Sequence, residues 1–318
     1  MGWGLLALCV ACTPQAQHTG GNVGSEPHAG VAATGEGGTT ARQLPTQRGQ
    51  GRPYEVTDTQ VWDVPDPVSG RVYQVFVALP PSYATEPTRR YPVLYATDAD
   101  YAFPVLRQIG RRLNVEGPAL EEFIIIGLSY AVGEDGMTSR RRDYTPTPKG
   151  PSSAPADAVH GGGAAYIAYL QQQVLPFVAD RFRTDESRRM FLGHSYGSLL
   201  GTQMLFEAPG LFQGYILGSP SYWYDSKVMQ RREAAYHQKH GELPARVYMY
   251  VGARETPPYV RGADLVGDAA QMAASLGSRD YASLQLTLEV LPDEDHLSVA
   301  PRGFTRGLRY LLSLPGKG

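Results

Sequence analysis

Cysteine is nearly absent from this chain of 318 residues, and its two cysteines, Cys9 and Cys12, lie within the first dozen positions. The rest of the protein can therefore form no disulfide bond and no thiolate metal site. Its seven histidines form no cluster with carboxylates at the spacing of metal ligands. The sequence thus predicts a protein that works without a metal ion or another cofactor.

Charge of one sign and long hydrophobic runs are lacking as well. The 29 basic and 31 acidic residues leave a net charge of −2, so no chain-wide basic field attracts nucleic acid. The apolar runs are shorter than the roughly 20 residues that span a bilayer. With 42% hydrophobic residues, the chain can still bury one large core. A small-molecule substrate is the expected partner, and the sequence does not indicate an oligomeric state.

The N-terminus carries a short apolar stretch, residues 3–12, with the size of a signal-peptide core. Ala11 and Cys12, followed by Thr13 and Pro14, resemble the lipobox of bacterial lipoproteins, in which Cys12 would be lipidated. The alternative is an apolar N-terminus that is merely frayed. Cys9 and Cys12 have the spacing of a redox pair, but the strand and helix that such a pair needs do not surround them. Any membrane contact is expected only through this anchor, which predicts an extracytoplasmic location.

A compositional change follows this segment. Residues 13–51 are mostly Gly, Thr, Ala, Gln and Ser, which cannot bury enough surface to offset the entropy of ordering. The sequence therefore predicts a signal-like segment at 1–12, a disordered linker at 13–51 and one folded domain at 52–318.

Within that domain, apolar strands alternate with helical segments. Strands are expected at 72–79, 93–97, 123–128, 189–192, 214–217, 247–251 and 284–291. Helical spacing occurs at 103–115, 166–182, 195–206, 263–276 and 304–312. Residues 131–162 are polar and rich in proline, and we expect an insertion there without an element of its own. This alternation predicts an α/β fold, with a mostly parallel, doubly wound sheet and helices on both faces.

The clearest motif is the run from Gly193 to Gly197, which fits G-x-S-x-G between a predicted strand and a predicted helix. At such a turn, side chains two residues from the serine would collide, and glycine removes them. The pattern therefore predicts Ser195 as a nucleophile at the carboxyl edge of the sheet. A small-residue turn without chemistry is the alternative.

A histidine and an acid should follow the serine along the chain. His237 and His240 lie in a polar stretch typical of a solvated helix face, whereas His296 follows the last strand. Glu255 is the first carboxylate after the strand at 247–251, which predicts it as the acid that orients His296. An alternative stays open, in which Glu255 is a surface carboxylate paired with a nearby arginine and the enzyme works with a Ser–His dyad.

Backbone amides should stabilise the oxyanion of an acyl-transfer intermediate. The N–H of Tyr196 follows the nucleophile directly, and a second donor is expected near Ala99 or Asp100, after the strand at 93–97.

From about residue 72 to 312, the chain resembles the esterase D-like "putative esterase" family of α/β hydrolases, which includes siderophore esterases, S-formylglutathione hydrolases, feruloyl esterases and mycolyltransferases. The segments that carry the resemblance are PVLYATDADYAF, FIIIGLSY, RRRDYTPTP, FLGHSYGSLLG, LGSPSYWYD, YVGARE and PDEDHLSV. The SPSYWYD and RDYTP segments are most similar to the bacterial siderophore-esterase branch. This resemblance implies hydrolysis of catecholate–serine esters, and in that branch a Ser–His pair without a functional acid is known. Ala99 stands where the family has a glycine.

The substrate contacts are less specific. Arg140 and Arg142 in the 131–162 segment, and Arg107 in the preceding helix, are candidates for binding an anionic or catecholate group, and Trp223 for lining a pocket. Ordinary solvated arginines and core packing explain these residues equally well. The sequence favours a serine esterase that acts through an acyl-enzyme. An acyltransferase of the same fold and a non-catalytic ligand-binding lipoprotein are the alternatives.

Overall fold

The computed structural model describes residues 51 and 53–316, so the segment 1–12, Cys12 and nearly all of the predicted linker lie outside the described residues. The chain divides into two units, Met1–Glu55 and Val56–Gly318. The helices and strands described below all belong to the second unit.

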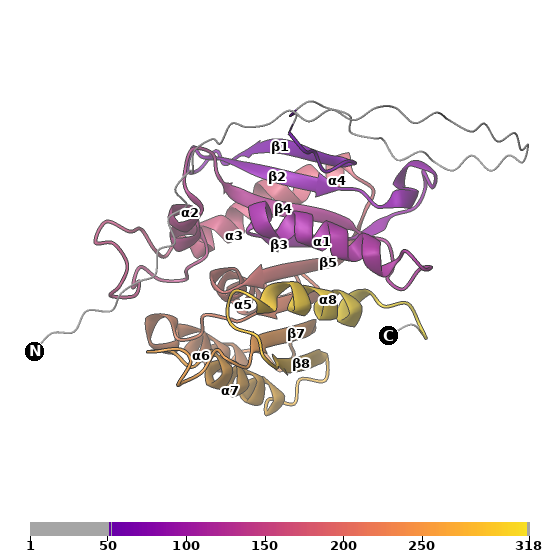
Figure 1. Cartoon of the computed structure of the whole chain (residues 1–318). Helices are drawn as coiled ribbons and strands as arrows, with labels where there is room; N and C mark the ends of the chain where they lie inside the picture. Colours follow the sequence, from indigo (N-terminus) through magenta and orange to yellow (C-terminus); the bar gives the residue numbers. More distant parts are fainter. Residues whose placement is uncertain (1–50, 52, 317–318) are drawn as a thin grey trace, which may run out of the picture. The chain divides into compact units, whose positions relative to one another are not determined.

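One eight-stranded sheet forms the centre of this unit, in the order β1-β2-β4-β3-β5-β6-β7-β8 (Figure 1). Only β2 runs against the other strands, so the sheet is mostly parallel. The strands are β1 Thr59–Pro65, β2 Val72–Ala78, β3 Tyr91–Thr97, β4 Ile124–Ala131, β5 Thr184–His194, β6 Gly214–Gly218, β7 Ala245–Gly252 and β8 Leu284–Leu291.

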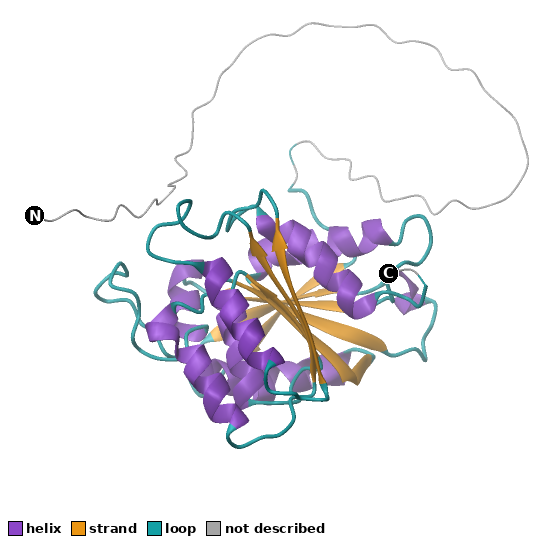
Figure 2. Ribbon diagram, turned by 90° about the horizontal axis from the view of Figure 1, so that it is seen from below, coloured by secondary structure: helices purple, strands orange, loops and turns teal. Residues whose placement is uncertain are grey.

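Helices cover both faces of the sheet, as Figure 2 shows with the sheet between two helical layers. The helices are α1 Ala99–Leu113, α2 Gly136–Asp143, α3 Gly163–Tyr169, α4 Leu175–Arg181, α5 Tyr196–Glu207, α6 Tyr224–His237, α7 Leu265–Gly277 and α8 Val299–Leu312, with short turns at Pro81–Ala84 (η1, 3₁₀) and Leu170–Val174 (η2, π). Because helices lie on both faces, every residue of β3 is buried. The predicted doubly wound α/β fold is confirmed.

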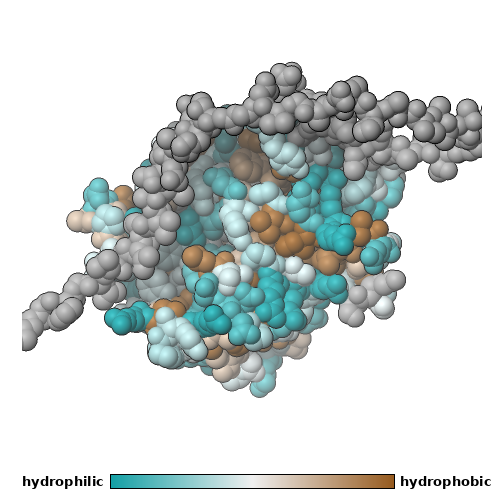
Figure 3. Space-filling view, viewed as in Figure 1, coloured by the Kyte–Doolittle hydropathy of each residue, from teal (hydrophilic) through white to brown (hydrophobic). Residues whose placement is uncertain are grey.

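The two faces have separate apolar cores. On one face, Phe103 and Leu106 of α1 meet Phe304 and Leu308 of α8. On the other, the helices from α3 to α7 enclose a larger core that includes Leu199. Figure 3 shows the α1 and α8 face, where apolar side chains gather near the centre and hydrophilic ones surround them.

The expectation that residues 131–162 hold no element is wrong, because they contain α2. Asp135 caps this helix, since its carboxylate accepts hydrogen bonds from the N–H groups of Met137 and Thr138. Three consecutive arginines in the last turn suit the negative end of the helix dipole. No apolar stripe marks such a helix in the sequence. Within the described part of the chain, no helix is long and apolar enough to cross a membrane.

Candidate active site

Ser195 lies between β5 and α5, at a backbone turn with φ 59° and ψ −117°. A Cβ on Gly193 would approach the carbonyl carbon of Gly197 to 2.2 Å, and a Cβ on Gly197 would approach Thr97 Oγ1 to 2.3 Å. Both positions therefore need glycine, as the sequence predicts. The turn places Ser195 at the carboxyl edge of the parallel strands, in a strained conformation typical of a nucleophile elbow.

Glu255 is fully buried and follows β7. Its Oε2 accepts a hydrogen bond from Nδ1 of His296 at 2.6 Å, and its Oε1 accepts from Ser219 Oγ at 2.6 Å and from the Gly252 N–H at 2.7 Å. A carboxylate can only accept, so Nδ1 carries the proton and Nε2 presents its lone pair. The carboxylate thus fixes the imidazole in the tautomer that a general base requires.

The alternative in which Glu255 pairs with a surface arginine is wrong. Arg254 pairs with Asp293, an exposed residue of the next loop, at 3.5 Å. The carboxylate of Asp295 caps its own turn by accepting from the N–H groups of Leu297 and Ser298. Among the carboxylates that follow Ser195, Glu255 is the one that reaches His296.

The residue before the nucleophile, His194, holds the His296 loop in place. Its Nε2 lies 2.9 Å from the carbonyl oxygen of His296, and its ring centroid lies 4.8 Å from that of His296. Because a carbonyl only accepts, His194 Nε2 donates, and Nδ1 accepts from the hydroxyl of Tyr250 at 3.3 Å. Loss of hydration lowers the pKa of His194 to about 3, and the nearby His296 adds to the shift. Sequence reasoning missed this contact, which only the fold creates.

The hydroxyl of Ser195 hydrogen-bonds that of Ser221, which is buried, at 3.3 Å. Ser221 and Ser219 belong to the loop after β6, and Ser219 has a positive φ of 40°. One strained loop therefore contacts both the nucleophile and the acid. In the sequence, this loop was indicated only by the SPSY segment, which directly follows a predicted strand.

Two helix N-termini meet beside Ser195. Tyr196 is the first residue of α5, and Ala99 and Asp100 begin α1. The first N–H groups of a helix have no partner within the helix and favour negative charge. Since α1 follows β3 and α5 follows β5, and β3 pairs with β5, these amides lie at the same edge of the sheet. They are suited to hold an oxyanion.

Of the predicted substrate residues, Arg140 and Trp223 lie at this edge. The Trp223 ring is half-buried and packs 6.2 Å from the ring of Tyr196. The guanidinium of Arg140 is already occupied, because its Nε lies 2.7 Å from Asp98 Oδ1. Arg140 therefore contacts the loop that follows β3 rather than presenting a free cation.

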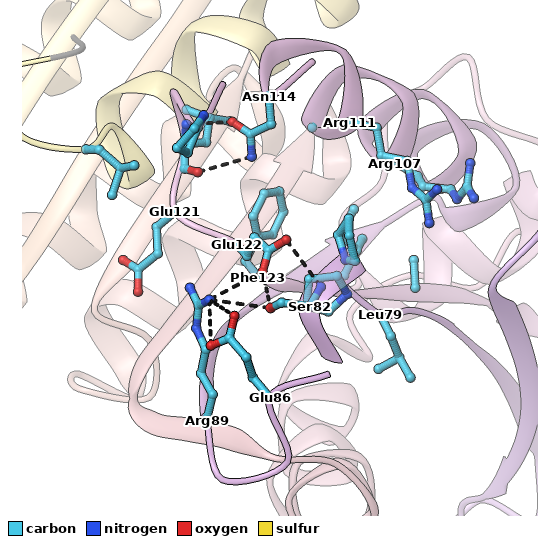
Figure 4. Close-up of a pocket in the computed structure, with 18 residues that line it drawn as sticks. Leu79, Ser82, Glu86, Arg89, Arg107, Arg111, Asn114, Glu121, Glu122 and Phe123 are labelled. Carbon is cyan, nitrogen blue, oxygen red and sulfur yellow. Dashed lines mark hydrogen bonds and ion pairs between the residues drawn. The ribbon is translucent and has the colours of Figure 1, made fainter. Parts of the chain in front are cut away.

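Arg142 does not fit the predicted substrate role, because its guanidinium lies between Asp143 at 2.8 Å and Glu134 at 2.7 Å, largely out of solvent. Arg107 does not fit it either. It lies two turns along α1, which runs away from the carboxyl edge, and it donates to the carbonyl of Thr57. Arg107 lines a pocket of about 610 Å³ at the opposite, amino edge of the sheet (Figure 4).

The model of the family "Putative esterase" matches residues 67–280. The chain is 26% identical to ferri-bacillibactin esterase BesA of Bacillus subtilis, over 85% of this chain and 95% of that protein. It is also 26% identical to the siderophore triacetylfusarinine C esterase of Aspergillus fumigatus, over 75% and 88% of the two chains.

The fold is similar to that of the BES protein of Bacillus cereus, with a TM-score of 0.70 at 22% identity over 83% and 100% of the two chains. Siderophore hydrolase EstA of Aspergillus nidulans gives a TM-score of 0.71 at 20% identity, over 83% and 98%. The predicted resemblance, including its siderophore-esterase branch, is confirmed. The chain belongs to the putative esterase family of α/β hydrolases and is a carboxylic ester hydrolase.

Proposed function

We propose that Ser195, His296 and Glu255 form the catalytic triad of this esterase. The observation that carries the proposal is the 2.6 Å bond between Glu255 and His296, made by a fully buried carboxylate. The contact between His194 and the His296 carbonyl brings that loop beside the elbow. The resting hydroxyl of Ser195 bonds Ser221, and in unliganded hydrolases the bond to the base often tightens only with substrate.

In the proposed reaction, Ser195 Oγ attacks the ester carbonyl carbon while His296 Nε2 takes the hydroxyl proton. The carbonyl oxygen becomes an oxyanion, held by the N–H of Tyr196 and by N–H groups of Ala99 and Asp100. Collapse of the intermediate releases the alcohol, which receives the proton from His296. Water then attacks the acyl-serine by the same steps and frees the acid.

The substrate class is the siderophore-type ester that appears in the names of the relatives. Trp223 and Tyr196 offer an aromatic wall beside the nucleophile. Arg140 and Arg142 are paired with carboxylates, whereas the half-buried Arg141 has no ion pair to any described residue. Of the three arginines, Arg141 is therefore suited to meet an anionic or catecholate group.

The test compares wild type with Ser195→Ala on a simple aryl ester and on an enterobactin-like cyclic trilactone. We expect turnover of both esters to fall about 10⁶-fold, because the nucleophile is lost. Ser82→Ala, at the amino edge, is the matched control and should retain full activity. Turnover by Ser195→Ala near the wild-type rate would contradict the mechanism. Cleavage of the aryl ester alone by wild type would contradict only the substrate class.

We also propose an extracytoplasmic protein anchored by lipid at Cys12, with residues 13–51 as the spacer. The lipobox-like sequence at Ala11-Cys12 supports this. In cells fed labelled palmitate, the wild-type protein should take up the label and Cys12→Ser should not. Cys9→Ser is the matched control and should be labelled like the wild type. Equal labelling of Cys12→Ser would exclude an anchor at this position.

A further inference from the structure

Near the start of α6, the backbone has the opposite hand from the rest of the helix. Asp225, Ser226 and Lys227 have φ values of 42°, 51° and 62°, with ψ values of 56°, 47° and 48°. Residues other than glycine adopt this conformation singly, and most often as Asn or Asp, because Cβ crowds the following carbonyl oxygen. Three such residues in succession persist only where their surroundings hold them.

Contacts within α6 and from α7 hold this left-handed turn. Arg231, further along α6, donates to the carbonyl oxygen of Asp225 at 2.9 Å and to that of Ser226. The ammonium group of Lys227 lies 2.8 Å from Oδ1 of Asp268 on α7. The turn is therefore fixed at both of its ends.

A third set of contacts comes from residues 144–162, the loop between α2 and α3 (Figure 1). Thr147 of this loop is bound twice. Its carbonyl oxygen accepts a hydrogen bond from the hydroxyl of Tyr224 at 2.7 Å, and its own hydroxyl donates to Asp225 Oδ2 at 2.8 Å. Two consecutive residues, where the backbone changes hand, thus hold one residue of the loop.

This clamp, formed by Thr147, Tyr224 and Asp225, contacts the aromatic wall beside the nucleophile. The Tyr224 ring is fully buried, packs edge-on against the ring of Tyr196 at 5.9 Å and lies 6.1 Å from that of Trp223. The side chain of Asp225 is only 9% exposed, so water competes little for its bond to Thr147. A change in the clamp is therefore transmitted to the aromatic rings.

We propose that Asp225 is a positioning residue that sets the aromatic wall for esters whose acyl group carries an aromatic ring. Its left-handed turn and its bond to Thr147 hold Tyr224, and with it the adjoining Trp223, in the orientation that receives this ring. The inference rests on the proposed serine esterase function and adds a basis for its selectivity. Loss of the clamp weakens binding of the aromatic group and leaves attack by Ser195 on a small ester unchanged.

The experiment compares para-nitrophenyl propanoate with para-nitrophenyl phenylpropanoate, which share a leaving group and differ by one ring. Thr147→Val replaces the hydroxyl that donates to Asp225 with a methyl group of similar shape, and keeps the carbonyl that binds Tyr224. We expect KM for the phenyl ester to rise about tenfold, with KM for the small ester and kcat for both nearly unchanged. Thr147→Ser keeps a hydroxyl and should retain the wild-type KM. A merely structural bond would change the melting temperature and not the ratio of the two KM values.

Ser226 tests the hand of the turn by itself, because its side chain is exposed and forms no hydrogen bond to any residue that the structure describes. Valine disfavours a positive φ, so Ser226→Val should also raise KM for the phenyl ester. Glycine adopts this conformation readily, so Ser226→Gly is the matched control and should retain the wild-type KM. If Ser226→Val fails to fold, the two Thr147 variants decide the question.

The outcomes separate the inference from the function on which it rests. A wild type that cleaves both esters, with the KM ratio unchanged in Thr147→Val, would overturn the inference and leave the esterase function standing. A wild type that cleaves only the small ester would do the same. A wild type that cleaves neither ester would overturn the proposed function, and the inference with it.

Discussion

The two edges of the sheet hold their polar groups in different ways. At the amino edge, ion pairs hold several charged side chains around the 610 Å³ pocket, with Arg89 between Glu86 and Glu122 (Figure 4). Arg111, which also lines the pocket, pairs with Asp58. None of the residues that line this pocket has a positive φ. The residues that line this pocket are thus free of positive φ angles, although Asp58 beside it has φ 59°, and several of its charged side chains are held in ion pairs.

At the carboxyl edge, the backbone is strained at Asp98, Ser195 and Ser219. Glu255 uses its hydrogen bonds to orient His296 and leaves Nε2 of that imidazole available. Strained residues persist only where their surroundings fix them, and they gather where chemistry takes place. Backbone strain beside the nucleophile, rather than the volume of a pocket, therefore distinguishes the edge that holds the proposed active site.

The sharpest test of this contrast replaces one glutamate at each edge. Glu255→Gln should lower kcat about 10³-fold, because an amide neither fixes the imidazole tautomer nor stabilises the imidazolium. Glu122→Gln at the amino edge should leave kcat unchanged, although it weakens the pair with Arg89. Steady-state kinetics on an aryl ester measures both. A loss under tenfold in Glu255→Gln would favour a Ser–His dyad.

The sequence predicted the geometry of the proposed site better than the ion pairs around it, because the elbow depends on neighbouring residues in the chain. The elbow is set by two glycines around Ser195, and Glu255 was found by its place after a strand. The ion pairs were not predictable, since Arg142 and Glu134 pair only once α2 folds. Arg107 was misplaced because α1 carries it about 12 Å from the carboxyl edge, at 1.5 Å per residue from Ala99.

A second pair of variants adds one methyl group at each edge. Gly197→Ala would bring its Cβ to 2.3 Å from Thr97 Oγ1, so the elbow or β3 must shift. We expect kcat to fall at least about tenfold and stability by about 1–3 kcal/mol. Gly110→Ala in α1 meets only the Phe123 ring, at 3.3 Å, which can move. Its gain in helix propensity of about 0.5–1 kcal/mol should offset the contact. Equal effects of the two variants on kcat would contradict the contrast between the edges.

The last expected effect changes stability at low pH and leaves turnover at neutral pH aside. Burial disfavours the charged ring and lowers the pKa of His194 to about 3 in the folded protein, from the ordinary histidine value of about 6.5. Above pH 6.5, the His194 ring is neutral in both the folded and the unfolded protein. As the pH falls from 6.5 toward 3, the unfolded chain binds a proton that the folded chain does not, so the free energy of unfolding decreases. This one group contributes a slope of at most about 1.4 kcal/mol per pH unit.

His194→Gln should remove that slope, since glutamine keeps a donor for the His296 carbonyl and does not titrate. Urea unfolding of wild type and variant at several pH values between 3.5 and 7 gives the difference directly. Tyr250→Phe is the matched control, because it removes the hydroxyl bonded to Nδ1 and keeps the imidazole, so the slope should persist. If the free energy of unfolding fell equally with pH in wild type and His194→Gln, burial of the neutral His194 would not be the cause of the acid sensitivity. The unfavourable features of the carboxyl edge would then be limited to its strained backbone turns.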